Sequence, residues 1–154
     1  MTKEVQVFNS ISLIIVILLL SLNLTGQKLD KHKWNNRILI VQANTGSMIK
    51  YQRQINLFDN LEVEFEERKL IVYEVIGNKY RSINYVETSK KSEWKIIESS
   101  FRKFLGDTDK FRIILIGLDG SIKLQKTELL EGNKLFDKID SMPMRKVELS
   151  KRRK

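Results

Sequence analysis

The chain has 154 residues, of which 42% are hydrophobic and 31% charged, and a net charge of +9; this balance suits one folded domain and excludes a disordered or fibrous protein. It contains no cysteine, which excludes disulfide bonds, thiol chemistry and cysteine-ligated metals. His32 is its only histidine, so a histidine-based triad or a multi-histidine metal site cannot be assembled, and we expect this residue to be solvated.

The first 26 residues have the layout of a secretory signal peptide. A short polar start with Lys3 precedes the apolar stretch 11–24, and the sequence becomes polar after Gly26. This stretch is shorter than the about 20 residues that a membrane-spanning helix needs. We therefore expect residues 1–26 to be a signal helix removed on export to the periplasm or the cell exterior. The alternative is an uncleaved N-terminal anchor.

The next part of the chain contains two apolar runs separated by a helical pattern. After a polar lead-in at residues 27–36, residues 37–43 form a near-continuous apolar run that predicts a strand covered on both faces. Residues 69–76 predict a second strand of the same kind. From Met48, apolar side chains recur every three or four residues, which predicts one helix running to about Glu64. This order implies that the two strands are parallel.

The following segments predict a loop, a helix and a hairpin. Residues 77–92 show no clear period, so we expect a long loop there. The apolar spacing of residues 94–105 predicts an amphipathic helix. In residues 111–125 two apolar strands flank Asp119 and Gly120. Because Asp-Gly supplies the positive φ of a tight turn, this segment predicts an antiparallel hairpin.

The last structured segment contains the only proline of the chain, Pro143, within the sequence Met-Pro-Met-Arg. Proline is disfavoured inside a helix but suits its first turn. We therefore predict a helix over residues 129–140, a break at which Ser141 caps the next helix, and a second helix through Leu149. The two methionines beside the proline are expected to pack, and the arginine after it to bind a carboxylate or carbonyl group.

The order strand–helix–strand, helix, hairpin, helix is that of a thioredoxin-like domain. We predict an α/β fold, with a three-layer α/β/α sandwich around a mixed sheet of about four strands. This domain is expected to span residues 37–149, between the N-terminal signal helix with its lead-in and a basic C-terminal tail at residues 150–154.

Five segments resemble the family called domain of unknown function 4174 (DUF4174). They are NRILIVQA (36–43), YQRQINLF (51–58), ERKLIVYEVIG (67–77), FRIILIGLDGSIKL (111–124) and LFDKIDSMPMRKVEL (135–149). The last two are the most specific. The chain departs from the family at Leu118, where a lysine is common.

The resemblance implies a thioredoxin-like fold in a small secreted bacterial protein, with no established reaction. It marks ten signature residues, which we expect to be structural: Arg37, Gln54, Arg68, Asp119, Gly120, Asp140, Met142, Pro143, Met144 and Arg145. In thioredoxin-like enzymes the reactive thiol lies at the turn after the first strand, and the corresponding turn here, residues 44–47, holds no sulfur. Thiol–disulfide exchange and peroxide reduction are therefore excluded.

The same turn is one candidate ligand surface. Asn44, Thr45 and Ser47 carry polar groups that could receive a small ligand. The interpretation that we favour is a capped helix start, because the Ser47 side chain can cap a helix by itself.

The basic tail is the other candidate surface, and its cations are Lys151, Arg152, Arg153 and Lys154. Such a block can bind an anionic polymer or lipid, or can simply keep a chain end soluble. Nucleic acid is not an expected partner of an exported protein.

These patterns favour an exported, non-enzymatic binding or interaction domain on a redox-inactive scaffold. We expect no cofactor, no metal and no catalytic residue, and a partner that is a protein or an anionic polymer of the envelope or extracellular space. One alternative is a cysteine-independent enzyme or small-ligand binder at residues 44–47. The other is an envelope-anchored protein that contacts anionic polymers or lipid and is held in the membrane by residues 11–24.

Overall fold

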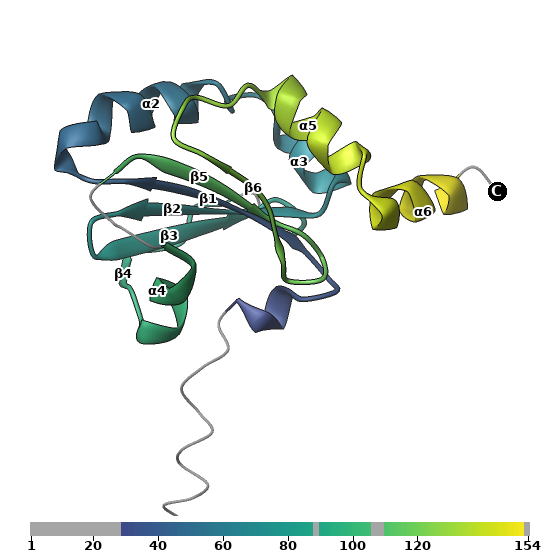
Figure 1. The fold of residues 1–154 in the computed structure, drawn as a ribbon, viewed down its shortest axis with the longest axis horizontal. Helices are drawn as coiled ribbons and strands as arrows, with labels where there is room; N and C mark the ends of the chain where they lie inside the picture. The colour runs from purple at the N-terminus through teal and green to yellow at the C-terminus, as the bar shows by residue number, and fades with distance from the viewer. Residues whose placement is uncertain (1–28, 88–89, 106–109, 153–154) are drawn as a thin grey trace, which may run out of the picture.

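A six-stranded sheet forms the centre of the molecule (Figure 1). The computed structural model describes residues 29–87, 90–105 and 110–152. The strands are β1 (Arg37–Ala43), β2 (Leu70–Ile76), β3 (Lys79–Asn84), β4 (Lys95–Ile96), β5 (Arg112–Ile116) and β6 (Ile122–Lys126), in the sheet order β4-β3-β2-β1-β5-β6. The α/β class is as predicted, but the sheet has six strands instead of about four.

Helices lie on both sides of this sheet. They are the 3-10 helices η1 (Asp30–His32) and η2 (Thr45–Ser47) and the α-helices α2 (Met48–Asn56), α3 (Glu62–Glu67), α4 (Ser99–Leu105), α5 (Gly132–Asp140) and α6 (Pro143–Arg152). Figure 1 shows α2, α3 and α5 over one face and α4 on the opposite side. No helix in the described part of the chain is long and apolar enough to cross a membrane. The signal peptide predicted for residues 1–26 lies outside the described residues.

The central strand β1 is buried along its whole length, as its apolar run predicted. It pairs in parallel with β2 and antiparallel with β5. Its alternate side chains enter two different cores, because successive residues of a strand point to opposite faces. Leu39 and Val41 enter the larger core, and Ile38 and Ile40 enter the smaller one.

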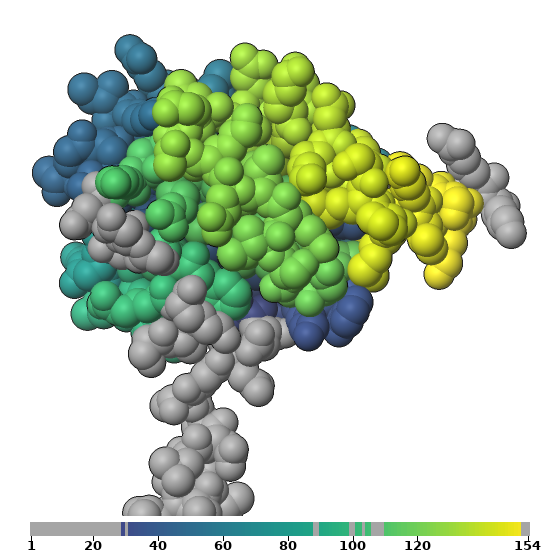
Figure 2. Space-filling view, in the orientation of Figure 1, coloured from purple at the N-terminus to yellow at the C-terminus, as the bar shows by residue number. Residues whose placement is uncertain are grey.

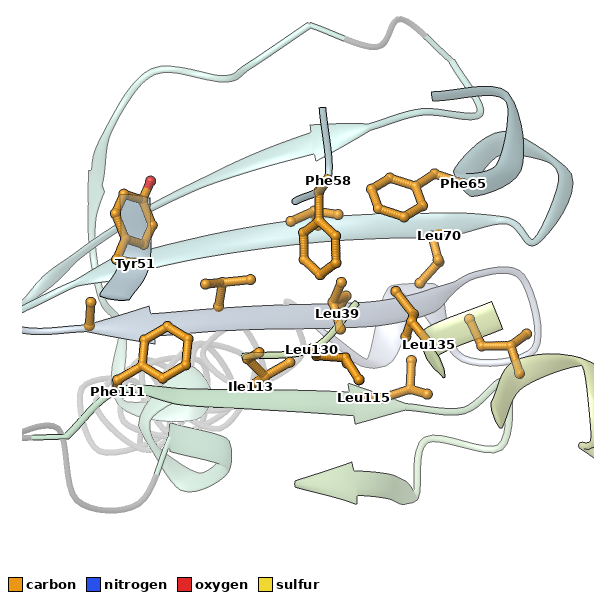
Figure 3. Packing of buried hydrophobic residues seen from close by; sticks show 14 of the residues in the cluster. Leu39, Tyr51, Phe58, Phe65, Leu70, Phe111, Ile113, Leu115, Leu130 and Leu135 are labelled. Carbon is orange, nitrogen blue, oxygen red and sulfur yellow. The ribbon is translucent and has the colours of Figure 1, made fainter. Parts of the chain in front are cut away.

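The larger core lies between the sheet and helices α2, α3 and α5 (Figure 3). Phe65 of α3 is fully buried in it, with its ring 5.5 Å from Phe58 and 4.9 Å from Tyr85 in edge-to-face contacts. Burying a side chain of this size contributes about 1.5–3 kcal/mol to folding. The strands contribute mainly Leu39, Leu70, Ile113 and Leu115, and Phe111 lies directly before β5.

The single helix predicted over residues 48–64 is in fact two helices, α2 and α3, separated by a turn. In this turn Asn60 has a φ of 63°, a left-handed conformation that asparagine tolerates and that interrupts a right-handed helix. The turn directs Phe58 into the core, where only 6% of it is exposed. Apolar spacing continues through the turn, so the period alone could not reveal the break.

The prediction of a long loop over residues 77–92 is wrong, because β3 occupies residues 79–84. Gly77, with a φ of 56°, makes the tight turn from β2 into β3. Tyr80 and Ile83 are the buried residues of β3. Their interval of three positions hides the two-residue alternation by which a strand is recognised.

The helix predicted over residues 94–105 begins later, at Ser99, because β4 takes up its first part. Trp94 is 38% exposed and packs against the guanidinium of Arg81, whose Cζ lies 4.6 Å from the ring centroid. Three apolar side chains of the predicted face do enter the smaller core: Ile97, Phe101 and Leu105.

The lead-in before β1 is folded against the smaller core. Leu29 and His32 are each only 7% exposed. His32 Nε2 lies 2.8 Å from the Tyr73 hydroxyl, and Nδ1 lies 3.4 Å from Asn36 Oδ1. Burial lowers the pKa of His32 below its usual value. The expectation of a solvated His32 is therefore wrong.

The hairpin predicted over residues 111–125 is present as β5 and β6. Gly120 has a φ of 78°, as the Asp-Gly turn required. Asp119 accepts hydrogen bonds from the Ser121 amide at 3.1 Å and from the Lys123 ammonium at 2.7 Å. The hydrogen bond from Lys123 lowers the pKa of Asp119 to about 2.

Two helices meet at the proline, and we call the link between them, residues 140–143, the joint. Helix α6 begins at Pro143 as predicted and runs to Arg152, beyond the predicted end at Leu149. Ser141 does not cap it. The Ser141 hydroxyl donates a hydrogen bond of 2.7 Å to the carbonyl oxygen of Lys138, at the end of α5.

Candidate functional site

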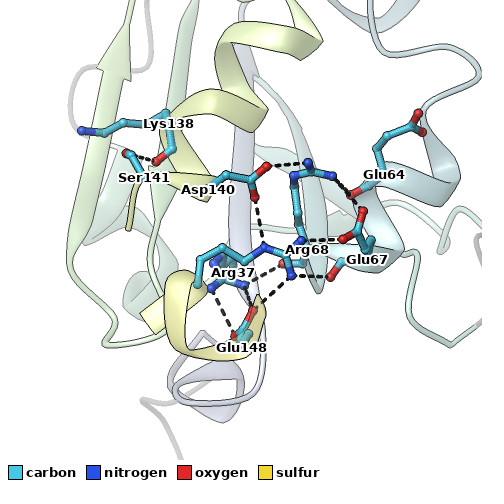
Figure 4. Close-up of polar contacts among 9 residues, drawn as sticks. Arg37, Glu64, Glu67, Arg68, Lys138, Asp140, Ser141 and Glu148 are labelled. Carbon is cyan, nitrogen blue, oxygen red and sulfur yellow. Dashed lines mark hydrogen bonds and ion pairs between the residues drawn. The ribbon is translucent and has the colours of Figure 1, made fainter. Parts of the chain in front are cut away.

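Charged side chains from four elements meet at the joint (Figure 4). We call them the joint cluster: Arg37, Glu67, Arg68, Asp140, Arg145 and Glu148. Four are signature residues, and they come from the start of β1, the end of α3, the end of α5 and α6. The fold therefore brings together residues that are far apart in the sequence.

Arg145 is the most heavily bonded member of the joint cluster. Its side chain is 1% exposed, with Nη2 2.7 Å from Glu67 Oε1 and Nε 3.0 Å from Asp140 Oδ1. Nη1 also donates to the carbonyl oxygen of Glu67 at 3.1 Å. Burial alone would lower the pKa of Arg145, but the carboxylates outweigh it and raise the pKa. Arg145 thus binds both a carboxylate and a carbonyl group, as predicted.

Arg37 is the second buried arginine, also with a side chain 1% exposed. Nη1 donates to the carbonyl oxygen of Arg68 at 2.9 Å, and Nη2 lies 3.2 Å from Glu148 Oε1. No group in the described part of the chain accepts a hydrogen bond from its Nε. Arg37 therefore retains one unused donor.

Arg68 and Asp140 complete the joint cluster through a hydrogen bond of 2.6 Å between Nη2 and Oδ2. The Arg68 guanidinium also lies 4.4 Å from the centre of the Phe136 ring. Burial would raise the pKa of Asp140, but the hydrogen bonds from Arg68 and Arg145 lower it. The cluster thus fastens α5 and α6 to the sheet and to α3.

A cavity of about 400 Å³ lies beside the joint cluster, and we call it the joint cavity. Figure 2 shows a hollow between the green hairpin and the yellow C-terminal segment. Five signature residues line the cavity: Arg37, Asp119, Met142, Pro143 and Met144. The other lining residues are Leu118, Lys123, Lys138 and Ser141. The cavity therefore combines an apolar lining with several charged groups.

The charges of the joint cavity are unequally paired. Lys123 is bound to Asp119 at 2.7 Å, and Arg37 is held by Glu148 outside the cavity lining. Lys138 is exposed and has no carboxylate within ion-pair distance in the described part of the chain. Lys138 is thus the cation of this lining whose charge is not balanced by a carboxylate of the described residues, so an anionic group is favoured beside it.

The turn at residues 44–47 does not gather free polar groups. Asn44 Oδ1 accepts hydrogen bonds from the Ser47 amide at 3.0 Å and from the Ser47 hydroxyl at 2.8 Å. The Ser47 hydroxyl oxygen in turn accepts from the Asn44 amide at 3.0 Å. This reciprocal capping starts η2, with Asn44 as the cap instead of Ser47, and Thr45 is exposed beside it. Gly46 and Ser47 border a broad, open depression.

The remaining signature and tail residues lie elsewhere. Gln54 fastens α2 to the segment before α5, because its amide donates to and accepts from the backbone of Leu130, each at 2.7 Å. Gly120 shapes the hairpin turn. Lys151 is exposed at the end of α6, whereas residues 153 and 154 lie outside the described residues.

A second polar cluster, which the sequence did not indicate, surrounds the fully buried Glu74 of β2. We call Tyr51, Glu74, Arg81 and Lys91 the Glu74 cluster. Glu74 Oε2 accepts hydrogen bonds from the Tyr51 hydroxyl at 2.5 Å and from Arg81 Nε at 2.7 Å. Oε1 lies 3.2 Å from Lys91 Nζ. A single glutamate inside an apolar run was the only available signal.

The Glu74 cluster borders a small cavity of about 130 Å³, which also includes Tyr85. Burial, reinforced by nearby carboxylates, raises the pKa of Tyr85 to about 12. Burial and the hydrogen bond to Glu74 raise the pKa of Tyr51 as well. Both hydroxyls are therefore protonated at neutral pH, and neither is a nucleophile or base there. Within residues 29–87, 90–105 and 110–152, no three His, Asp or Glu side chains are grouped to hold a metal ion.

Comparison with known families places the chain. Residues 28–148 match the family described as a domain of unknown function, DUF4174. The chain belongs to the DUF4174 family. No curated protein and no solved structure matches it. The DUF4174 region contains the joint cluster, the joint cavity and the Glu74 cluster entirely.

Proposed function

We propose that this DUF4174 chain is an exported binding domain without catalytic activity, on a redox-inactive, thioredoxin-like scaffold. The observation that carries the proposal is the joint cavity, where apolar side chains and cations surround about 400 Å³. Small-molecule sites commonly have such a concave, mostly apolar lining with a few polar groups that fix orientation.

The chemistry of the cavity supports binding more than catalysis. Ser141 is its only hydroxyl-bearing lining residue, and that hydroxyl donates to the backbone carbonyl of Lys138. A serine nucleophile needs an adjacent base, and the only carboxylate lining the cavity, Asp119, has a pKa of about 2. Such a weak base does not activate a hydroxyl group at neutral pH.

The thioredoxin-like part of the proposal is supported by the parallel β1–β2 unit, the β5–β6 hairpin and helices on both faces of the sheet. Strands β3 and β4 extend this arrangement at one edge. The absence of cysteine from the sequence leaves the scaffold without thiol redox chemistry.

A ligand screen on the ¹⁵N-labelled full chain tests the binding proposal. We expect hits that shift the amide resonances of Leu118, Lys138, Met142 and Met144, and that mass spectrometry recovers chemically unchanged. Hits that bind only at other surfaces would contradict the assignment of the joint cavity. A hit that is converted to product would contradict the absence of catalysis.

Export is tested separately, on the protein recovered from cells. If residues 1–26 form a signal peptide, the intact mass of the exported product corresponds to a chain that starts near Gln27. Recovery of the complete N-terminus from a membrane fraction would support the anchored alternative instead.

A further inference from the structure

We propose that the ligand of the joint cavity is a small organic carboxylate, held with its charged end at Lys138 and its apolar body against Leu118, Met142 and Met144. This inference depends on the binding function proposed above and adds the chemical class of the ligand.

The apolar half of the cavity comes from side chains with different degrees of burial. Leu118 and Met142 are 5% and 8% exposed, so they form its inner surface, whereas Met144 is 41% exposed and forms its rim. Methionine side chains adapt to the shape of a bound group. An apolar body placed here would remove the exposed part of Met144 from water, which is favourable by about 25 cal/mol per Å².

The charged half of the cavity favours an anion. Lys138 is the one lining cation without a carboxylate partner in the described part of the chain, and Lys123 already shares a hydrogen bond with Asp119. The buried Arg37 also lines the cavity and has an Nε without an acceptor. The N-terminus of α6 at Pro143 adds a partial positive charge at the same rim.

Both halves together restrict the ligand class. A neutral apolar ligand would cover Lys138 without offering it a partner, which costs free energy. An inorganic anion would leave the apolar lining exposed to water. The cavity volume of about 400 Å³ lies in the lower part of the usual range of about 300–1,000 Å³ for small-molecule sites. The apolar body of the ligand must therefore be compact.

Binding of three probes to the full chain at pH 7 tests the inference: octanoate, octanamide and inorganic phosphate. The first two share an apolar body and differ in charge, whereas phosphate has charge alone. We expect octanoate to bind about fivefold more tightly than octanamide and at least about tenfold more tightly than phosphate. Equal affinities for octanoate and octanamide, or for octanoate and phosphate, would overturn the proposed class.

Variants locate the charged end. Lys138→Gln is expected to weaken the binding of octanoate about fivefold and to leave the binding of octanamide unchanged. Lys134→Gln is the matched control, because Lys134 is exposed on the same helix and does not line the cavity. Equal effects of the two variants would overturn the placement at Lys138 in favour of general electrostatic attraction.

A third variant locates the apolar body and separates the two proposals. Met144→Gln keeps the length of the side chain but makes it polar, and it is expected to weaken the binding of octanoate and of octanamide to the same extent. If octanoate does not bind while compounds from the screen do bind at the joint cavity, the carboxylate inference fails and the binding function stands. If nothing binds at this cavity, both fail.

Discussion

The joint cluster and the Glu74 cluster bury opposite charges. In the joint cluster the arginines are inside, since Arg37 and Arg145 are 1% exposed while their carboxylate partners are 21–39% exposed. In the Glu74 cluster the carboxylate is inside at 0%, and its cations Arg81 and Lys91 are 23% and 46% exposed. Each cluster thus has a buried member that depends on partners nearer the surface.

The two clusters also differ in what they hold together. The joint cluster connects α5 and α6 to β1 and the end of α3, so it fastens the C-terminal segment to the domain. The Glu74 cluster connects α2 to the neighbouring strands β2 and β3. Arginine suits the first task, because its five donors reach several acceptors at once, whereas a carboxylate suits a place where donors converge from different elements.

Arg145→Ala is expected to have the largest effect on stability. It removes one buried cation, leaves the Glu67 carboxylate without its 2.7 Å ion pair and takes away one of the two guanidinium groups that bind Asp140, at a cost of about 3 kcal/mol in the free energy of unfolding. Urea unfolding of the full chain measures this loss. Arg145→Lys keeps the charge but lacks the planar guanidinium group, so its free energy of unfolding should lie between those of wild type and Arg145→Ala. An unchanged free energy of unfolding, combined with a loss of octanoate binding, would contradict the structural role of Arg145.

Glu74→Gln is expected to cost less, about 2 kcal/mol. The glutamine can still accept one hydrogen bond, and Arg81 and Lys91 can turn to water because they are partly exposed. The same urea series measures it, with Glu62→Gln as the control for an exposed carboxylate on the same small cavity. A larger loss than that of Arg145→Ala would reverse the proposed ranking of the two clusters.

The two regions were not equally predictable from the sequence. The joint could be located because a proline has one favoured place in a helix, and Pro143 does begin α6. The hairpin was equally readable from Asp119 and Gly120. In both cases a local chemical rule decides the conformation.

The features that the sequence did not reveal depend on tertiary contacts. The ion pairs Arg37–Glu148 and Arg145–Glu67 each cross more than 70 residues, and no spacing rule connects the members of either pair. The role of Glu74 depends on β3, whose two buried residues are three apart and therefore lack the alternation that predicts a strand. His32 is buried by contacts with Tyr73, far along the chain.

Acid is expected to weaken the joint cluster. The pKa of Asp140 is lower in the folded chain than in the unfolded chain, so the unfolded state takes up protons first as the pH falls. Its contribution is complete above about pH 4 and is lost as the pH falls through the folded pKa. Urea midpoints of wild type and Asp140→Asn should therefore converge below pH 4. A constant difference down to pH 2 would contradict this assignment.

Alkali is expected to weaken the Glu74 cluster instead. The pKa of Tyr51 is raised in the folded chain, so its contribution is complete below about pH 10 and declines as the unfolded state ionises at higher pH. Tyr51→Phe should remove this part of the alkaline loss, and Tyr85→Phe should remove another part. Unfolding curves between pH 8 and pH 11 that keep the same slope in Tyr51→Phe as in wild type would contradict the shift.

Lys151→Gln is expected to have the smallest effect and to mark the limit of the joint cluster. Lys151 lies on α6, as Arg145 does, but its side chain is exposed and outside the cluster. A surface charge of this kind changes the free energy of unfolding by less than about 0.5 kcal/mol. If the tail binds anionic polymers, retention on heparin should fall while unfolding stays unchanged. Unchanged retention would remove Lys151 from any account of the tail, and a large loss of stability would mean that the fastening of α6 extends beyond the joint cluster.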